Sequence, residues 1–145
     1  MRKQATALAA ILAAFAIGTA DAAEHEVKML NKGEKGAMVF EPDFLEVEPG
    51  DTIKFLAVDK GHNAESIKGM LPDGAAGFKG KINEEVVYAI EQEGVYGIKC
   101  TPHYAMGMVM LVVAGEPANA EAAAAVRQPG KAKQVFADLF ARLGE

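Results

Sequence analysis

The chain has 145 residues, about the length of one domain, and its 20 acidic residues outnumber its 15 basic residues, which gives a formal net charge of −5. A nucleic-acid-binding protein would normally show a basic excess, so we expect no nucleic-acid partner.

The N-terminus has the three parts of a secretory signal peptide. The chain starts with basic residues, residues 5–20 carry no charge, and an A-x-A cleavage pattern ends at Ala22. The apolar run is shorter than the roughly 20 residues that a membrane span needs. We therefore predict that residues 1–22 are a signal peptide, that residues 23–145 form the mature domain, and that the protein is exported without a membrane anchor.

Short stretches with strand character follow, separated by turn residues. The predicted strands are Val27–Leu30, Ala37–Phe40, a third that begins at Phe44, Thr52–Val58, Val86–Ile90, Gly94–Cys100 and Met108–Val113. This pattern favours an antiparallel sandwich or barrel. In the strand that ends at Cys100, Tyr96 and Ile98 share the face of Cys100, so the thiol points inward if they do. Residues 59–83 form a long irregular stretch, which in a small β domain is often functional.

The pattern becomes helical after Gly115 and Pro117. Asn119 is a candidate N-cap for a helix over Ala120–Gln128. In Lys131–Leu143 the apolar residues recur every three or four positions, as in one stripe of an amphipathic helix. We predict two helices, the second of which packs its apolar stripe on the sandwich.

Metal-binding side chains are concentrated in a short segment. It holds the thiol of Cys100, the imidazole of His103 and the thioethers of Met106 and Met108, and His62 lies upstream in the irregular stretch. In an oxidising compartment a single cysteine cannot pair within its chain, so another role is expected. A structural zinc site usually has four donors from cysteine, histidine or carboxylate. Two histidines, one cysteine and a weak axial methionine instead form the blue-copper pattern. Spacing alone leaves the axial place open between Met106 and Met108.

Several motifs of this sequence resemble those of the pseudoazurins, a family of cupredoxins found in bacterial denitrifiers. The resemblance includes Val27-Lys-Met-Leu-Asn-Lys, Gly36-Ala-Met-Val-Phe-Glu-Pro, Asp59-Lys-Gly-His-Asn and Tyr96-Gly-Ile-Lys-Cys-Thr-Pro-His-Tyr-Ala-Met-Gly-Met. Plastocyanins share the Cys-x2-His-x4-Met spacing, but the helical tail separates the two families. The resemblance implies an all-β fold, a cupredoxin-like Greek-key β-sandwich of about eight strands with two C-terminal α-helices, and one type 1 copper ion.

The resemblance also implies roles for individual residues. His62 and His103 would be the imidazole ligands, Cys100 the thiolate ligand and Met108 the axial ligand. Asn63 would support the site, its backbone N–H reaching the sulfur and its side chain tying the two ligand loops together.

The function implied is that of a monomeric periplasmic electron carrier, which passes single electrons to copper nitrite reductase or another denitrification reductase. A redox partner would dock near His103 through four lysines, namely Lys32, Lys60, Lys79 and Lys99. The alternative is a periplasmic copper carrier or storage protein without a redox role. An enzyme with a Cys100–His103 nucleophile pair is not favoured, because no third group to orient the histidine is evident.

Overall fold

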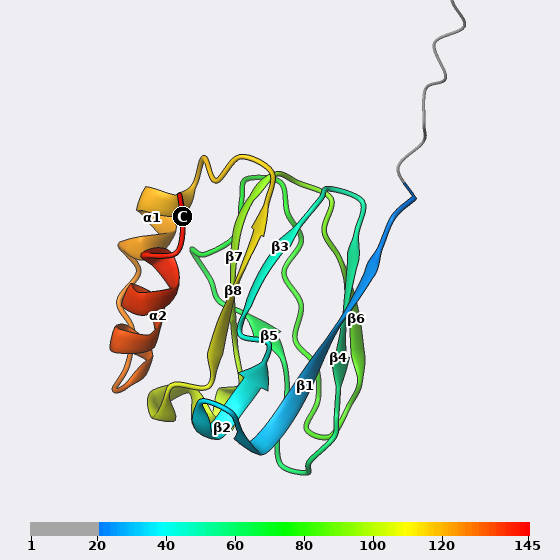
Figure 1. Cartoon of the computed structure of the whole chain (residues 1–145), viewed down its shortest axis with the longest axis vertical. Helices are drawn as coiled ribbons and strands as arrows, with labels where there is room; N and C mark the ends of the chain where they lie inside the picture. Colours follow the sequence, from blue (N-terminus) through cyan, green and yellow to red (C-terminus); the bar gives the residue numbers. More distant parts are fainter. Residues whose placement is uncertain (1–20) are drawn as a thin grey trace, which may run out of the picture.

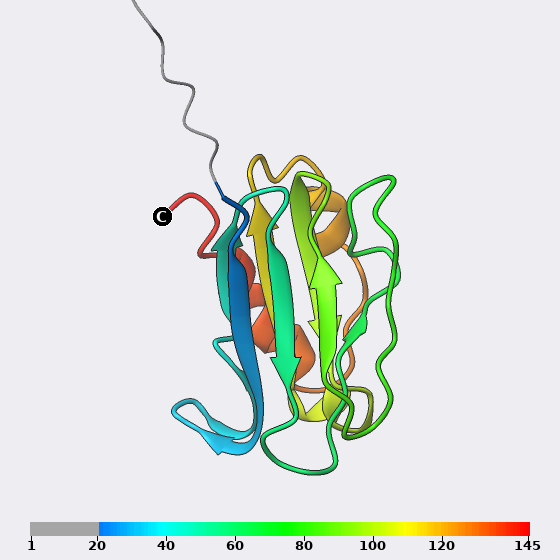
Figure 2. The ribbon, with the colours of Figure 1, turned by 90° about the vertical axis from the view of Figure 1, so that its right-hand side faces the viewer.

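The computed structural model describes residues 21–145, so the predicted signal peptide lies outside the described residues except for its last two positions. Two sheets pack face to face, and two helices lie against the outer side of one of them (Figures 1 and 2). The strands are β1 (Glu24–Gly33), β2 (Gly36–Glu41), β3 (Phe44–Val47), β4 (Thr52–Leu56), β5 (Glu65–Ser66), β6 (Val86–Ala89), β7 (Gly94–Lys99) and β8 (Val109–Ala114). The helical elements are the 3-10 helix η1 (Thr101–Met106), α1 (Ala120–Ala124) and α2 (Ala132–Phe140).

The strand order is that of a Greek-key sandwich. One sheet has the order β2-β1-β4-β6 and the other has the order β3-β8-β7-β5. The pairs β1–β4 and β3–β8 are parallel, while β1–β2, β4–β6, β5–β7 and β7–β8 are antiparallel. The chain thus crosses repeatedly between the sheets instead of completing one before the next. The predicted fold class is confirmed, with eight strands and two C-terminal helices among the described residues.

The strand that leads to the cysteine is buried on both faces. Tyr96, Ile98 and Cys100 belong to the core between the sheets. Val95, on the opposite face, belongs to a second core with Phe136 of α2. The prediction that Cys100 points inward with Tyr96 and Ile98 is therefore confirmed. A strand covered by a sheet on one side and by helices on the other has no solvent-facing side, which explains its continuous apolar character.

The helices are shorter than the sequence predicted. α1 ends at Ala124 instead of Gln128, and α2 covers Ala132–Phe140 of the predicted Lys131–Leu143. Asn119 stands at the N-cap position of α1, but its side chain makes no capping hydrogen bond. Its amide instead accepts the backbone N–H of Val95 at 2.7 Å and donates to the Val95 carbonyl at 3.0 Å. The side chain thus ties the helices to β7. No helix among residues 21–145 has the length and apolarity to cross a bilayer.

The long irregular stretch contains a strand that the sequence did not predict. β5 has only two residues, and it pairs with the end of β7 through Glu65↔Lys99 and Ser66↔Ile98. A two-residue strand is too short to show the alternation on which sequence prediction depends. β5 matters for the site because it fixes the chain just after His62 beside the strand that leads into Cys100.

Candidate metal centre

The ligand loop, residues 100–108, is a compact connection between two neighbouring strands. It starts where β7 ends, passes through η1, and turns at Gly107, whose φ of +91° favours glycine. The backbone N–H of Cys100 donates to the carbonyl of Met108 at 3.0 Å, and the N–H of Met108 donates to the carbonyl of His103 at 3.2 Å. The antiparallel pairing of β7 with β8 thereby continues to the first and last residues of the loop.

Three potential metal ligands converge inside this loop and the stretch before β5. Nδ1 of His62 and Nδ1 of His103 lie 3.1 Å apart, and Sγ of Cys100 lies 3.7 Å from the first and 3.5 Å from the second. Metal–nitrogen and metal–sulfur bonds are each about 2.0–2.3 Å long, so donors less than about 4 Å apart can share one ion. Two imidazoles and a thiolate are also the strong donors of a blue-copper site. The residues present therefore fit a copper ion.

The ring of His62 is oriented by Asn31, a residue that the sequence analysis missed. His62 is fully buried, and its Nε2 lies 2.8 Å from Oδ1 of Asn31 in β1. The amide oxygen accepts a hydrogen bond from Nε2, which leaves the lone pair of Nδ1 free for a metal. Asn31 is itself held in place, because its backbone N–H donates to Oδ2 of Asp59 at 2.7 Å. Asn31 lies in the motif Val27-Lys-Met-Leu-Asn-Lys, but that motif gives it no role at the site, because Asn31 lies 31 residues from His62 in the sequence.

Burial keeps the imidazole of His62 neutral and opposes ionisation of the cysteine. Desolvation lowers the pKa of His62, as does the nearby His103. Desolvation raises the pKa of the Cys100 thiol, and the backbone N–H groups of Asn63 and His103 act in the opposite direction because they favour the thiolate. A neutral imidazole is the form that binds a metal, and a bound cation deprotonates a coordinating thiol.

Asn63 connects the two segments that carry the ligands, as predicted. Its Oδ1 accepts the backbone N–H of Thr101 at 2.7 Å, and its Nδ2 donates to Oγ1 of Thr101 at 3.1 Å and to the carbonyl of Gly80 at 3.1 Å. The hydroxyl of Thr101 donates onward to the carboxylate of Glu65 in β5. The backbone N–H of Asn63 lowers the pKa of the Cys100 thiol, against the effect of burial.

The two candidate axial methionines differ in their surroundings. Met108 is fully buried and belongs to the same core cluster as Cys100. Met106 is 50% exposed and lines a surface pocket with Lys131 and Val135. The remaining histidine, His25, lies 2.8 Å from Oδ2 of Asp51 through its Nε2 and is not part of the cluster of His62, Cys100 and His103.

The four lysines predicted to surround the site differ in exposure and in the residues beside them. Lys32 comes directly after Asn31, and Lys60 comes two residues before His62. Lys79 lines a shallow surface hollow together with Asn63, Gly80, Lys81, Ile82, Thr101 and Pro102. Lys32, Lys60 and Lys79 are exposed, whereas Lys99 is half-buried and holds its ammonium 4.9 Å from the centre of the Tyr104 ring. His103 is itself half-buried, beside the exposed Pro102.

The sandwich and its two-histidine, one-cysteine cluster define a copper protein of the cupredoxin class. Residues 27–115 match the family of copper binding proteins described as plastocyanin/azurin. The chain is 54% identical over 131 residues to the pseudoazurin of Paracoccus pantotrophus, which covers 90% of this chain and 89% of that protein. It is 50% identical over 140 residues to the pseudoazurin of Methylorubrum extorquens, covering 94% of this chain and 95% of that one. The crystal structure of Hyphomicrobium denitrificans pseudoazurin superposes with a TM-score of 0.80 at 46% identity, covering 84% and 99% of the two chains. The chain therefore belongs to the pseudoazurins, with copper as its cofactor.

Proposed function

We propose that this pseudoazurin is an exported blue-copper electron carrier in which His62, Cys100 and His103 hold the copper and Met108 supplies the weak axial thioether. Family membership supports copper binding and electron carriage rather than catalysis. The observation that carries the ligand assignment is the convergence of two imidazole nitrogens and one thiol sulfur within 4.8 Å. The burial of Met108 beside Cys100 supports it over the exposed Met106 as the axial residue.

Copper at such a site takes up and releases one electron between Cu(II) and Cu(I), since thiolate and thioether favour the reduced ion and imidazole serves the oxidised one. The protein's part is to hold the donors in one arrangement for both states. Asn31 fixes the ring of His62, Asn63 links the two ligand segments, and the sandwich encloses Cys100 and Met108 away from water. Groups that move little on electron transfer keep that transfer fast.

The test of the ligand set is the colour of the protein after addition of Cu(II). The wild type should turn intensely blue, because the thiolate of Cys100 transfers charge to Cu(II) when it absorbs visible light. Cys100→Ser should lose the colour and keep its β-sheet circular dichroism, because the sandwich has a core of its own. A blue serine variant would show that the ligand set is wrong. A colourless wild type that holds only Cu(I) would favour the copper carrier or storage function.

We propose further that residues 1–22 are a signal peptide, removed to leave a monomer in the periplasm. Asp21, Ala22 and Ala23 are exposed and precede β1, where a protease can reach them. The proposed partner is an acidic redox protein, copper nitrite reductase or another denitrification reductase, that docks near His103. Intact-mass measurement of the exported protein tests the cleavage site, and a chain that does not begin at Ala23 would contradict it.

A further inference from the structure

We infer that the segment between the two C-terminal helices, residues 125–131, is a brace that positions the ligand loop and so controls the speed of electron transfer. We call this segment the connector. The inference rests on the proposed function, because it requires that His103 and Met108 serve the copper. It gives the helical tail a role in the metal site beyond covering the sheet.

The ligand loop has backbone hydrogen bonds of its own, among them that from the N–H of Gly107 to the carbonyl of Tyr104 at 3.0 Å, but its side chains have little packing to hold them. None of the six residues of η1 is buried, and the helix deviates from regular geometry at His103. Near its start the loop is held by Thr101, which bonds to Asn63 and Glu65. Those bonds do not reach the second half of the loop, residues 104–107, which connects His103 to Met108.

The connector supplies the missing contacts to this second half. The backbone N–H of Lys131 donates to the carbonyl of Ala105 at 2.9 Å. The hydroxyl of Tyr104 donates to Oε1 of Gln128, and Nε2 of Gln128 lies 3.0 Å from Sδ of the fully buried Met70. The loop is thereby linked through Gln128 to the packed interior of the domain.

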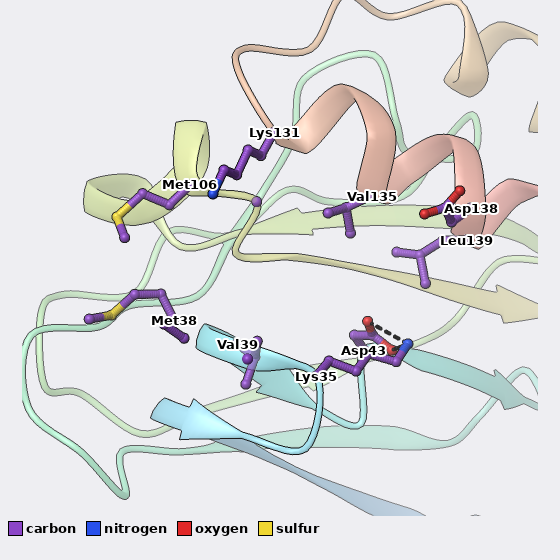
Figure 3. A pocket seen from close by; sticks show the side chains of 12 residues that line it. Lys35, Met38, Val39, Asp43, Met106, Lys131, Val135, Asp138 and Leu139 are labelled. Atoms are coloured by element: carbon purple, nitrogen blue, oxygen red, sulfur yellow. Dashed lines mark hydrogen bonds and ion pairs between the residues drawn. The ribbon is translucent and has the colours of Figure 1, made fainter.

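The connector and the loop also approach each other more closely than side chains would allow. A Cβ on Gly130 would lie 2.4 Å from the carbonyl oxygen of Ala105, and the φ of Gly130 is +50°. A Cβ on Gly107 would lie 3.0 Å from Cγ2 of Val135 and 3.4 Å from Cβ of Lys131. Figure 3 shows the start of α2, with Lys131 and Val135, over the end of the loop, where Met106 lines the same pocket. Glycine at position 130 lets the backbone of the connector meet that of the loop, and glycine at position 107 leaves room for the side chains of Val135 and Lys131.

Bracing matters for a carrier because each transfer changes the charge of the metal. If the loop can shift, His103 and Met108 rearrange at every step and the rearrangement adds to the barrier. A loop held at both ends keeps its donors in place in both oxidation states. The connector is therefore a positioning element that acts through the loop, while the ligands themselves come from elsewhere.

Gly130→Ala tests the brace in the copper-loaded full domain. The new Cβ should push the connector away from Ala105 and slow electron self-exchange between Cu(I) and Cu(II) protein by about tenfold, the lower end of what loss of a supporting group costs at metal sites. NMR line broadening in mixed oxidation states measures that rate. The copper hyperfine splitting should shift as well. Gly144→Ala is the matched control, because Gly144 also has positive φ, at +92°, but a Cβ there meets nothing within 4 Å.

Tyr104→Phe is the second variant and decides the matter if Gly130→Ala does not fold. It removes only the hydroxyl that bonds Gln128, so it should slow self-exchange in the same direction by a smaller factor. The brace is refuted if the wild type is blue and both variants exchange electrons at the rate of Gly144→Ala, even if they are less stable. A wild type that is not blue would instead overturn the proposed function.

Discussion

Substitution of each of the two candidate axial methionines should affect the copper differently. Met108→Leu should keep the copper but shift its reduction potential and visible spectrum, because a thioether is a weak axial ligand whose loss tunes the metal without releasing it. Met106→Leu should do much less, since its side chain is 50% exposed. Voltammetry and absorption spectra of both variants test this. The reverse ranking would move the axial role to Met106.

Asn31 provides a second test at the scale of one residue. Asn31→Leu removes the oxygen that accepts from Nε2 of His62, so the buried ring loses both its orientation and a hydrogen-bond partner. We expect copper affinity to fall by about tenfold, as is usual when the partner of a metal-binding histidine is lost. Titration against a copper chelator measures this. Asn31→Asp, which keeps an acceptor, is the control, and equal affinities in the two variants would argue against an orienting role.

Among the site residues, those that lie close together in the chain can be predicted from their side-chain chemistry. The role of a residue that only the fold brings to the site, such as Asn31, is missed. Cys100, His103 and the two methionines fall within nine residues, so donor chemistry alone indicates copper. Spacing does not choose between Met106 and Met108. The family resemblance favours Met108, and the burial of Met108 supports that proposal. The role of Asn31 was missed, although it lies in a family motif, because an asparagine in a strand is an ordinary residue until the fold brings it to a histidine ring.

A buried carboxylate, Asp51, lies at the end of the first sheet where the central strands β1 and β4 begin to pair. Asp51 is 6% exposed, and its oxygens bond to Nε2 of His25 and to the backbone N–H groups of Ala23 and Glu48. These hydrogen bonds, that of His25 first, lower the pKa of Asp51 to about 2 from its usual 3.8. If the chain is cleaved before Ala23, the nitrogen that bonds Asp51 becomes an α-ammonium, which adds a charge to the interaction.

The lowered pKa of Asp51 makes the stability of this pairing depend on pH. A carboxyl group whose pKa is lower in the folded chain stabilises it above the unfolded pKa, and this stability is lost as pH falls toward the folded value of about 2. Asp51→Asn should lower the free energy of unfolding by about 1–2 kcal/mol at pH 7, as for loss of hydrogen bonds to a charged group. Its difference from the wild type should shrink between about pH 5 and pH 2. Denaturant unfolding across this range measures both.

A neutral substitution elsewhere controls for the loss of a carboxylate as such. Asp73 is exposed, so Asp73→Asn should leave both the stability and its acid dependence close to those of the wild type. If Asp51→Asn keeps its full deficit at low pH, the effect comes from packing and not from the charge of the carboxylate.

Most of the elements were predictable, including the four-residue strands β3 and β6. Alternation along β4 and the three-to-four spacing in α2 follow directly from burial on one face or stripe, and β7 was recognised although it is buried on both faces. β5 has too few residues for any period. The sequence marks Asn119 as a helix cap because that residue type is common there, but its amide is used by the backbone of Val95. The hydrogen bonds of Asn119 to Val95, which is distant in the sequence, thus take the place of the expected capping bond to the start of α1.

The whole molecule combines a net negative charge with exposed lysines around the proposed docking site. The chain carries a formal charge of −5, yet Lys32 and Lys60 adjoin residues that touch or form the site, and Lys79 shares a surface hollow with Asn63 and Pro102. Such asymmetry orients the encounter with an acidic partner more than it strengthens the complex. The effect lies chiefly in the association rate.

Electron transfer to the partner should therefore slow as salt rises, because charges at the surface are screened beyond about 8–10 Å at physiological ionic strength. Reversing the charge of Lys32, Lys60 or Lys79 to Glu should slow transfer further at low salt while the copper spectrum stays the same. Stopped-flow rates against ionic strength measure both effects. Lys99→Glu should also slow transfer, but it is a less clean test, since it removes the ammonium that lies over the Tyr104 ring of the ligand loop.

The control for this prediction comes from α2. Lys133 is exposed there and is not one of the four predicted docking lysines, so its reversal changes the net charge by the same amount and leaves those lysines in place. Arg142 is a poorer control because its guanidinium lies 4.1 Å from the centre of the Phe44 ring, and its reversal would disturb packing as well as charge. If net charge alone mattered, Lys133→Glu would slow electron transfer to the partner as much as Lys60→Glu and Lys79→Glu do. A docking face requires that Lys133→Glu follow the wild type at every salt concentration, and equal slowing in both sets would show that no basic face guides the partner.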